Sequence, residues 1–408
     1  MEQLGISKLD LKRQNRMQVL KIIKQKGPTS RIDIANTLEL TRAAVTIITN
    51  EMIEQGVITE IGESKQVPDI VQRGRKKILL DINHNFKFAL GITVEENLVS
   101  IGLSTLAGEV LDKCQVEINK STQFEELLGY IRRSFLRILS DNCLGADSVI
   151  GIGLGVAPSM YYRMQIDVVN KTADFRKLVS IFKSFTTLPV VVDNYVKGAA
   201  MANIDFQKNK DPNRHNIAFL TYGESLHFVV TNLNDPIISY DNRTDFVDNM
   251  IINPGSVMGI GSGNGNVQTE LTSSAFRNKI IPYYTREDVP YLYDKTNGDI
   301  SKVTRRLIYE SINNGDEKIR WMYTEIMLFT AVLLNNLIFS TNPQKLVLHD
   351  FNFSESEFTY LKSIVEKVAG EEIAKLIDLS IIEDKNRFLA GSAIAIRELF
   401  FSRGGFSC

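Results

Sequence analysis

The sequence contains few of the residues that build metal sites or disulfide frameworks. Its 408 residues include only three cysteines and four histidines, and both kinds are widely scattered along the chain. Cys114, Cys143 and Cys408 show neither the short spacing of zinc ligands nor that of a small disulfide-rich domain. We therefore expect no metal ion and no cofactor, and the low cysteine content favours a reducing, cytoplasmic location.

An apolar leader and a long hydrophobic run are also missing. The first 15 residues are mostly charged or polar, unlike the apolar centre of a signal peptide. The most apolar run, residues 326–339, is interrupted by Thr330, Asn335 and Asn336. It is also shorter than the roughly 20 apolar residues that span a bilayer. The sequence therefore predicts no membrane partner.

Charge is balanced overall but unevenly distributed. The formal net charge is −1, yet residues 1–80 contain 14 Lys and Arg against 9 Asp and Glu, and the remainder contains 33 against 39. A basic N-terminal segment on an acidic body is typical of a nucleic-acid-binding module joined to a soluble domain. The length of the chain favours two or three domains.

Residues 30–56 have the pattern of two helices joined by a tight turn. Ser30 and Thr41 are suitable N-cap residues for the two helices, and Asp33 stands three places after Ser30. Apolar residues recur at helical spacing in the second helix, at Val45, Ile48, Met52 and Ile53. Residues 15–25 form another helix, which would complete a three-helix core. Glu39 occupies the turn position where glycine is common.

The opposite face of the second helix suits the major groove of DNA. Its side chains are short, polar or basic, which allows close contact with base edges. We predict DNA contacts from Thr41, Arg42, Ala44, Thr46 and Thr49. The alternative is a helical hairpin whose polar face is simply solvated.

A wing follows the two helices. Residues 57–61 and 77–82 have strand character and flank a polar loop, residues 62–74. The returning arm carries Arg73, Gly74 and Arg75. Glycine permits close backbone approach, and the two guanidinium groups suit phosphates or a narrow minor groove. The alternative is a solvated basic turn.

From about residue 83 the pattern changes to alternating strands and helices. The first series contains expected strands at 88–94, 98–104, 110–118, 149–156 and 190–192 and expected helices at 123–140, 175–185 and from 195. The second contains strands at 217–221, 227–231 and 345–349, the longest helix at 317–339 and a last helix at 386–400. Such a repeated pattern predicts an α/β body of two lobes with a cleft between them.

These segments resemble the ROK family (repressor, open reading frame, kinase). The first eighty residues, with Arg73-Gly74-Arg75, are similar to the family's winged-helix head. The body matches mainly at scaffold positions, namely 91–92, 106–111, 151–158, 192–194, 199–202, 342–348 and 390–393. The resemblance implies an actin-like ATPase (ribonuclease H-like) body of two lobes, oligomerisation through that body, and sugar or sugar-phosphate ligands.

The chain departs from the family's kinases at the positions that carry chemistry. Tyr195 stands where the resemblance places the catalytic aspartate, and a phenol with a pKa near 10 is a poor base at neutral pH. The glycine-rich phosphate turns are replaced by residues 91–96, 222–227 and 349–351. The family's zinc motif of one histidine and three cysteines is absent from residues 248–249 and 261–266. We therefore expect no enzymatic activity.

A sugar site is only partly preserved. Asn194 matches the family's asparagine that hydrogen-bonds sugar hydroxyls. Asp193, Asn170 and Glu270 are further candidates for ligand binding, although each fits equally well as a solvated polar residue in a loop. A polyol ligand requires several converging polar groups.

The combined prediction is a sequence-specific transcriptional regulator, most simply a repressor of carbohydrate-related genes. Its expected parts are a winged helix-turn-helix (residues 1–82), a first lobe (83–203), a second lobe (204–385) and a C-terminal helix (386–408) returning to the first lobe. The expected partners are double-stranded DNA with an inverted-repeat operator, a sugar or sugar-phosphate effector, and a second copy in a homodimer or dimer of dimers. The alternatives are a ligand-independent DNA-binding scaffold and an active sugar kinase.

Overall fold

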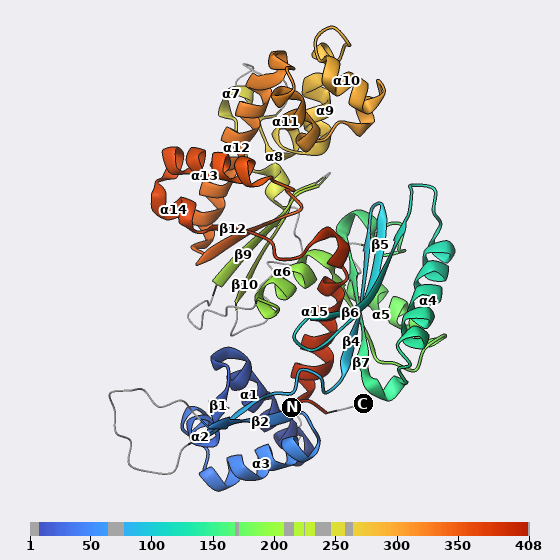
Figure 1. Ribbon diagram of the computed structural model, residues 1–408, viewed down its shortest axis with the longest axis vertical. Coiled ribbons are helices and arrows are strands. Elements are labelled where there is room, and N and C mark those ends of the chain that lie inside the picture. The colour runs from blue at the N-terminus through green and yellow to red at the C-terminus, as the bar shows by residue number, and fades with distance from the viewer. Residues whose placement is uncertain are drawn as a thin grey trace, which may run out of the picture. The chain divides into compact units, whose positions relative to one another are not determined.

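The computed structural model describes residues 8–63, 77–167, 171–207, 216–223, 225–232, 246–257 and 264–406. The chain forms two compact units (Figure 1). The first comprises residues 1–212 and 382–408, and the second comprises residues 213–381. The chain thus crosses between the units near the lobe boundaries predicted at 203/204 and 385/386.

The N-terminal head is a winged helix-turn-helix, as predicted. Its helices are α1 (Lys8–Lys26), α2 (Arg31–Leu38) and α3 (Arg42–Glu54). Its short strands are β1 (Thr29–Ser30), β2 (Ile58–Glu63) and β3 (Ile78–Ile82), which form an antiparallel sheet in the order β1-β3-β2. The first helix starts at Lys8, earlier than the predicted residue 15.

Local side-chain chemistry fixes the helix boundaries in the head. Ser30 and Thr41 are the N-caps of α2 and α3, and their hydroxyls accept from the backbone N–H groups of Asp33 and Ala44. Both bonds are 3.2 Å long. Glu39 ends α2 with φ of 54°, in the left-handed region that favours glycine. The turn is therefore made at a conformational cost.

The core of the head includes residues from the far end of the chain. Its own buried apolar side chains are Val19, Leu20, Ile22, Ile23, Ile34, Ala35, Val45, Met52, Val57, Ile58, Leu80 and Ile82. Ala395, Ile396, Leu399 and Phe400 belong to the same cluster. Burial of apolar surface is the main favourable term in folding. The C-terminal segment is therefore part of the winged head as well as of the first lobe.

The first lobe is built on a five-stranded sheet. Its strands are β4 (Phe88–Glu95), β5 (Leu98–Ser104), β6 (Val110–Glu117), β7 (Val149–Val156) and β8 (Val190–Asn194), in the order β6-β5-β4-β7-β8. The pairs β4–β7 and β7–β8 are parallel, and β4–β5 and β5–β6 are antiparallel. Its helices are α4 (Phe124–Asp141), α5 (Lys171–Lys183), α6 (Tyr195–Asp205) and α15 (Leu389–Ala395).

Helix α15 lies directly on the backbone of the sheet. A Cβ atom on Gly91 would lie 2.1 Å from the carbonyl oxygen of Phe388, and one on Gly153 would lie 2.0 Å from that of Gly391. Neither position tolerates a side chain without backbone movement. The predicted last helix, residues 386–400, is in fact α15 followed by a π-helical turn (Ile396–Phe400) and a 3₁₀ turn (Phe401–Arg403).

Polar contacts reinforce the junction between the head and the C-terminal segment. The buried guanidinium of Arg16 donates from Nε to Gly404 O at 2.8 Å and from Nη1 to Gln55 Oε1 at 2.7 Å. Its carbon Cζ lies 4.0 Å from the centre of the Phe406 ring. A guanidinium stacked on an aromatic face in this way is attracted by the ring quadrupole. Arg16 therefore joins α1, α3 and the C-terminal segment.

A buried acid completes the junction at the end of α6. Asp205 accepts from Arg397 Nε at 2.7 Å and from Arg397 Nη2 at 3.0 Å, and lies 2.9 Å from Lys24 Nζ of α1. Burial raises the pKa of this carboxyl, but the charges and hydrogen bonds of Arg397 and Lys24 outweigh burial and hold the pKa well below its ordinary value. The carboxylate thus links the head to two helices of the first lobe.

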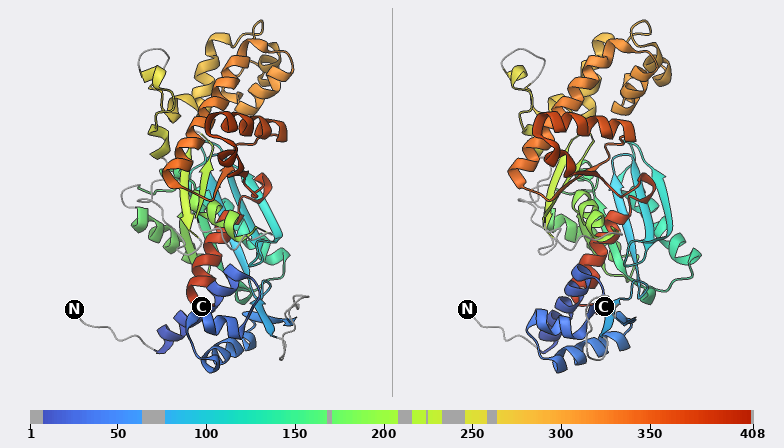
Figure 2. Two further views of the ribbon diagram at one scale, coloured as in Figure 1. Left: turned by 90° about the vertical axis from the view of Figure 1, so that its left-hand side faces the viewer. Right: turned by 60° about the vertical axis from the view of Figure 1, so that its left-hand side comes forward.

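The second unit combines a four-stranded sheet with a group of helices (Figure 2). Its strands are β9 (Asn216–Thr221), β10 (His227–Asn232), β11 (Lys345–His349) and β12 (Ile377–Leu379), in the order β10-β9-β11-β12. Its helices are α7 (Pro254–Val257), α8 (Val267–Glu270), α9 (Ser273–Ile280), α10 (Pro290–Thr296), α11 (Arg305–Asn313), α12 (Arg320–Thr341), α13 (Glu355–Ala369) and α14 (Glu371–Lys375).

Helix α12 is longer than the apolar run seen in the sequence. With the 3₁₀ turn before it, the helical stretch Glu317–Thr341 covers 25 residues and is long and apolar enough to cross a membrane by length and composition. The sequence-based estimate that this run is too short is therefore corrected. Its apolar residues, including Ile326, Leu334 and Ile338, belong to the core of the second unit. Core packing thus accounts for the composition.

We expect Glu39→Gly to stabilise the head by about 0.5–1 kcal/mol, because glycine adopts the left-handed conformation without the steric penalty of a Cβ atom. Thermal unfolding of the full chain, with hydrogen exchange of α2 and α3, measures the change. The matched control is Glu39→Ala, which removes the same charge and keeps the Cβ atom. An equal gain in both variants would attribute the effect to charge.

We expect Asp205→Asn to destabilise the junction by about 3 kcal/mol at pH 7, because it leaves the Arg397 guanidinium buried without its counter-charge. The native carboxyl has a depressed pKa, so its contribution is present above the unfolded pKa of about 4 and is lost as the pH falls below that value. The difference between variant and native protein should therefore shrink on acidification.

Hydrogen exchange of the α1 amides, corrected for the intrinsic pH dependence, measures this difference. The control is Asp141→Asn, because that exposed carboxylate lies 3.9 Å from Arg137 on the surface of α4. We expect no measurable change from the control. A difference that stays constant from pH 7 to pH 3 would contradict the assigned role of Asp205.

Candidate nucleic-acid interface and ligand site

Helix α3 presents one open face on the outer side of the head (Figure 1). The exposed side chains of this face are Arg42, Ala43, Thr46, Ile47 and Asn50. Ile47 is 70% exposed, which is unusual for a large apolar residue on a folded domain. Methyl-bearing and short polar side chains with one arginine suit the major groove, where they meet thymine methyl groups and base-edge acceptors.

Two of the predicted contact residues do not belong to this face. Thr49 is fully buried, and its hydroxyl donates to Val45 O at 2.8 Å, so a polar side chain fits the core without an unsatisfied group. Ala44 is half-buried. Thr41, Arg42 and Thr46 are exposed. The prediction placed the wrong face of α3 outward, because it assigned Thr49 to the exposed face from its polarity alone.

Arg31 holds α3 against the wing. Its Nε donates to Thr49 Oγ1 at 3.1 Å, its Nη2 donates to Asn50 Oδ1 at 3.0 Å, and its Nη1 lies 2.8 Å from Glu60 Oε1 of β2. Arg31, at the start of α2, therefore connects α3 to strand β2 of the wing. The sequence analysis missed Arg31, Ala43, Ile47 and Asn50. Counting 3.6 residues per turn from Ala43 gives Ile47 and Asn50, but no local signal identifies Arg31.

The predicted tip of the wing lies outside the described residues. This applies to Arg73, Gly74 and Arg75, for which the DNA contact remains a prediction. The described base of the ribbon is tied to the helices, because Lys77 Nζ lies 2.8 Å from Asp33 Oδ1. The Lys77 and Ser30 hydrogen bonds hold the pKa of Asp33 below its ordinary value.

Asp193 and Asn194 lie where β8 meets α6. Asn194 is the N-cap of α6, is 1% exposed, and accepts from the N–H of Val196 at 2.7 Å. Asp193 accepts from the N–H of Asn194 at 2.7 Å and lies 3.7 Å from Lys197 Nζ. The Asn194 side-chain oxygen therefore caps the helix, and its amide nitrogen is the atom suited to donate to a ligand.

Tyr195 belongs to a charged cluster beside this turn. Arg387 Nη1 lies 2.6 Å from Glu95 Oε2 and donates to the Tyr195 hydroxyl oxygen at 3.2 Å. A phenol that accepts from a guanidinium is not prepared to accept the proton of an attacking alcohol. The Glu95 carboxylate is also neutralised by Arg387. Glu95 belongs to the altered first phosphate turn, residues 91–96. Its carboxylate is therefore already paired with a cation of the protein itself.

Glu270 lies in the second unit, at the end of α8. It is 1% exposed, its Oε2 lies 2.6 Å from Lys279 Nζ, and its Oε1 accepts from Asn253 Nδ2 at 3.2 Å. Lys279 Nζ also lies 3.3 Å from Glu325 Oε2. The carboxylate of Glu270 therefore has a partly buried counter-ion, Lys279, that the sequence did not reveal. The fourth candidate, Asn170, lies outside the described residues.

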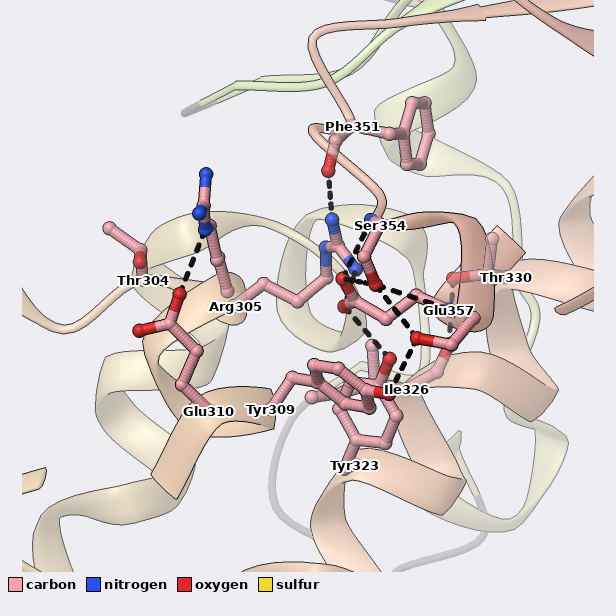
Figure 3. Close-up of polar contacts among 12 residues, drawn as sticks. Thr304, Arg305, Tyr309, Glu310, Tyr323, Ile326, Thr330, Phe351, Ser354 and Glu357 are labelled. Carbon is pink, nitrogen blue, oxygen red and sulfur yellow. Dashed lines mark hydrogen bonds and ion pairs between the residues drawn. The ribbon is translucent and has the colours of Figure 1, made fainter. Parts of the chain in front are cut away.

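The turn after β11 is closed by a buried polar network (Figure 3). Arg305 Nη1 lies 3.0 Å from Glu357 Oε1, which also accepts from the Tyr323 hydroxyl at 3.0 Å. Arg305 Nη2 donates to Phe351 O, and Glu357 Oε2 accepts from the N–H of Ser354 at 2.9 Å. Burial and the Glu357 charge raise the pKa of Tyr323. This network fixes residues 351–354, next to the altered turn at 349–351.

Two further features of the described residues concern metal and anion binding. There, no three His, Cys, Asp or Glu side chains are grouped so that they could hold a metal ion. A surface hollow of about 920 Å³ in the first lobe includes Arg163, Asp174 and Lys177. Arg163 Nη2 already donates to the carbonyl oxygens of Asn119 and Thr122 at 2.7 and 2.9 Å. Asp174 and Lys177 pair with each other.

Comparison with known sequences supports both parts of the chain. Residues 12–59 match the family model described as winged helix-turn-helix DNA-binding. A xylose repressor from Staphylococcus xylosus is 23% identical over 348 residues, which cover 82% of each chain. The N-acetylglucosamine repressor of Escherichia coli O157:H7 is 32% identical over 122 residues, which cover 30% of this chain and 29% of that protein.

Solved structures show the same fold. A ROK family transcriptional regulator, described as a homolog of the E. coli MLC protein, superposes with a TM-score of 0.69 and 19% identity, covering 97% of this chain and 98% of that chain. The ROK hexokinase of Thermus thermophilus superposes with a TM-score of 0.56 and 16% identity, covering 76% and 98%. The chain therefore combines a winged helix-turn-helix DNA-binding head with a sugar-kinase-like body, and it is similar to xylose repressors and to a ROK family transcriptional regulator.

Proposed function

We propose that this protein is a sequence-specific DNA-binding repressor of carbohydrate-related genes whose kinase-like body senses a sugar or sugar phosphate. The observation that carries the proposal is the open face of α3, held by Arg31 in a winged head. The chain that carries this head is similar to a xylose repressor over 348 residues, which cover 82% of both chains. Action on the chromosome would place the protein in the cytoplasm.

The head has the chemistry of a duplex-binding module. Arg42 supplies a fork of donors suited to guanine, and Ala43, Thr46 and Ile47 supply methyl groups suited to thymine. The excess of Lys and Arg in residues 1–80 supplies the electrostatic attraction to phosphates. A homodimer, or a dimer of dimers, would present two such heads to an inverted repeat.

The body is proposed to bind a ligand without transferring phosphate. Tyr195 accepts from Arg387 at the position where the kinases of the family carry a base, so no free carboxylate stands there to accept a proton. Asn194, Asp193 and Asn170 are the proposed sugar contacts in the first unit. Glu270 is a weaker candidate, because Lys279 already neutralises it.

Helix α6 offers a physical route from the ligand residues to the head. It begins at Asn194, its described side chains are all buried, and it ends at Asp205, which contacts Lys24 of the head. Because an α-helix is stiff along its axis, displacement of its N-terminus would be transmitted to Asp205. Coupling requires that the ligand bind two conformations of the body with different affinities.

Selection of bound fragments from random duplex DNA should return an inverted repeat with half-sites one or two helical turns apart. Affinity for that repeat should fall at least about a thousandfold between 50 and 200 mM salt, because several Lys and Arg side chains release counter-ions. Fluorescence anisotropy with the selected duplex and with a scrambled duplex measures both effects. Indifference to every duplex at low salt would contradict the proposal.

Variants separate base recognition from phosphate attraction within that assay. Arg42→Ala should weaken binding to the selected duplex more than to the scrambled one. Arg73→Ala and Arg75→Ala should weaken both, unless the wing recognises groove width. The matched control is Arg176→Ala, which removes an exposed charge from α5 and should change neither affinity by more than twofold.

Calorimetric titration with a panel of sugars and sugar phosphates, with and without the selected duplex, tests the sensing role. At least one should bind and should weaken DNA binding. Asn194→Asp should abolish its heat of binding, because the variant keeps the capping oxygen and loses the amide donor. An ATP-dependent hexose phosphorylation by the pure protein that is lost in Tyr195→Ala would overturn the non-catalytic assignment.

A ligand-independent scaffold is the second candidate function. The observations that favour it are the use of the Asn194 oxygen as a helix cap and the neutralisation of Glu270 by Lys279. Both leave fewer groups for a polyol. If no sugar or sugar phosphate gives heat and operator affinity is unchanged by all of them, the body serves dimerisation alone.

A further inference from the structure

One contact fixes the orientation of the Asn50 amide on the open face of α3. Asn50 Oδ1 accepts from Arg31 Nη2 at 3.0 Å. An asparagine amide carries an acceptor and a donor, its oxygen and its nitrogen, whereas a guanidinium carries donors alone. The atom that faces Arg31 must therefore be the oxygen. The amide nitrogen lies on the other side of the group, and it is the atom that Asn50 can offer to a ligand.

Two further contacts hold the guanidinium of Arg31 in place. Its Nε donates to Thr49 Oγ1 at 3.1 Å, and its Nη1 lies 2.8 Å from Glu60 Oε1. Thr49 is fully buried, and its own hydroxyl donates to Val45 O within α3. Arg31 therefore cannot turn away from Asn50 without losing its bonds to a buried hydroxyl and to a carboxylate. The orientation of the Asn50 amide is thus built into the folded head.

The neighbours of Asn50 on this face offer different chemistry. Ala43 and Ile47 are apolar, and the Thr46 hydroxyl donates its proton to Arg42 O at 2.7 Å, which leaves its oxygen and its methyl group for a ligand. Arg42 carries donors, but it stands eight positions before Asn50. That separation is about 12 Å along the helix axis. Successive base pairs are only about 3.4 Å apart, so the two residues reach different base pairs.

A fixed donor distinguishes two classes of base in the major groove. Guanine and thymine present a keto oxygen there, whereas adenine and cytosine present an amino group. An asparagine that offers both its oxygen and its nitrogen pairs with adenine, which has a donor beside an acceptor. Because Arg31 occupies the Asn50 oxygen, Asn50 offers donors alone. It can bond to a keto oxygen, but it would meet an amino group donor to donor, which excludes the wrong partner.

We propose that Arg31 makes Asn50 a donor-only contact that selects a keto base, guanine or thymine, at one position of the operator half-site. The proposal rests on the proposed function, because it requires α3 to lie in the major groove. It goes beyond that function by naming the class of base and the residue that enforces the choice. Asn50 contacts the base, and Arg31 is a positioning residue that acts through Asn50.

The first test locates the contacted base pair. Fluorescence anisotropy measures the affinity of the full chain for the selected duplex and for duplexes with each of the other three base pairs at every half-site position. Asn50→Ala should remove the base preference at one position and leave the preferences at the others. At that position the native protein should bind guanine and thymine at least about tenfold more tightly than adenine and cytosine on the same strand.

The second test inverts the contact. Asn50→Asp keeps the shape of the side chain and an oxygen for Arg31, but it replaces the outward donor with an acceptor. At the same position this variant should prefer adenine or cytosine over the keto bases by about tenfold or more. The matched control is Asn36→Asp, which adds the same charge at an exposed position of α2. The control should lower the affinity for all duplexes alike and leave the base preference unchanged.

The third test examines the positioning role of Arg31. Arg31→Met removes the donors and frees the Asn50 amide to turn, so the affinity for adenine relative to guanine should rise at least about fivefold at that position. Arg13→Met, a change of the same kind at an exposed position of α1, should leave the preference as it is in the native protein. Circular dichroism checks that each variant remains folded.

Several results would overturn the proposal. They are an Asn50→Ala variant that keeps every base preference, a native preference for adenine or cytosine at the Asn50 position, and an Asn50→Asp variant with the native preference. An Arg31→Met variant that loses affinity equally for all four bases would overturn the positioning role. Each of these results would leave sequence-specific DNA binding, and with it the proposed function, intact. A native protein that selects no duplex would contradict both.

Discussion

The contact between α15 and the sheet of the first lobe determines where the C-terminal segment enters the winged head. At Gly91, Gly153 and Gly391 two backbones meet with no room for a Cβ atom. Because such a contact cannot slide without a clash, α15 holds a fixed position on β4 and β7. Its continuation reaches the head, where Ile396, Leu399 and Phe400 enter the core. One glycine-lined contact therefore positions both the lobe and the DNA-binding head.

The sequence predicted the head well because its signals are local. N-caps at Ser30 and Thr41 and a 3.6-residue apolar period define α2, the turn and α3 within a few residues. The prediction was wrong about Thr49, since a threonine hydroxyl can bond to the carbonyl four residues earlier and be buried. Polarity alone therefore does not fix the rotation of a helix. The position of Arg31 between α3 and the wing depends on tertiary contacts that no spacing reveals.

The environments of the candidate ligand residues were less predictable, because they depend on partners distant in sequence. Asn194 has the expected place at the start of α6, but Glu270 is neutralised by Lys279, and Tyr195 is engaged by Arg387 from the last part of the chain. The alternating strands and helices predicted the architecture of the two lobes, since periodicity is a local property. The pairing of charged side chains, in contrast, depends on tertiary contacts that form only in the completed fold.

The shared core at the C-terminal end has a consequence for synthesis of the protein. The N-terminal head is made first, yet Phe400 lies in its core and the carbonyl of Gly404 accepts from buried Arg16. A nascent chain on the ribosome therefore carries a head that lacks part of its interior until residues 395–404 have been synthesised. Chains that end prematurely would display a loosened recognition helix. The core of the head is thus completed only after the intervening kinase-like body has been synthesised.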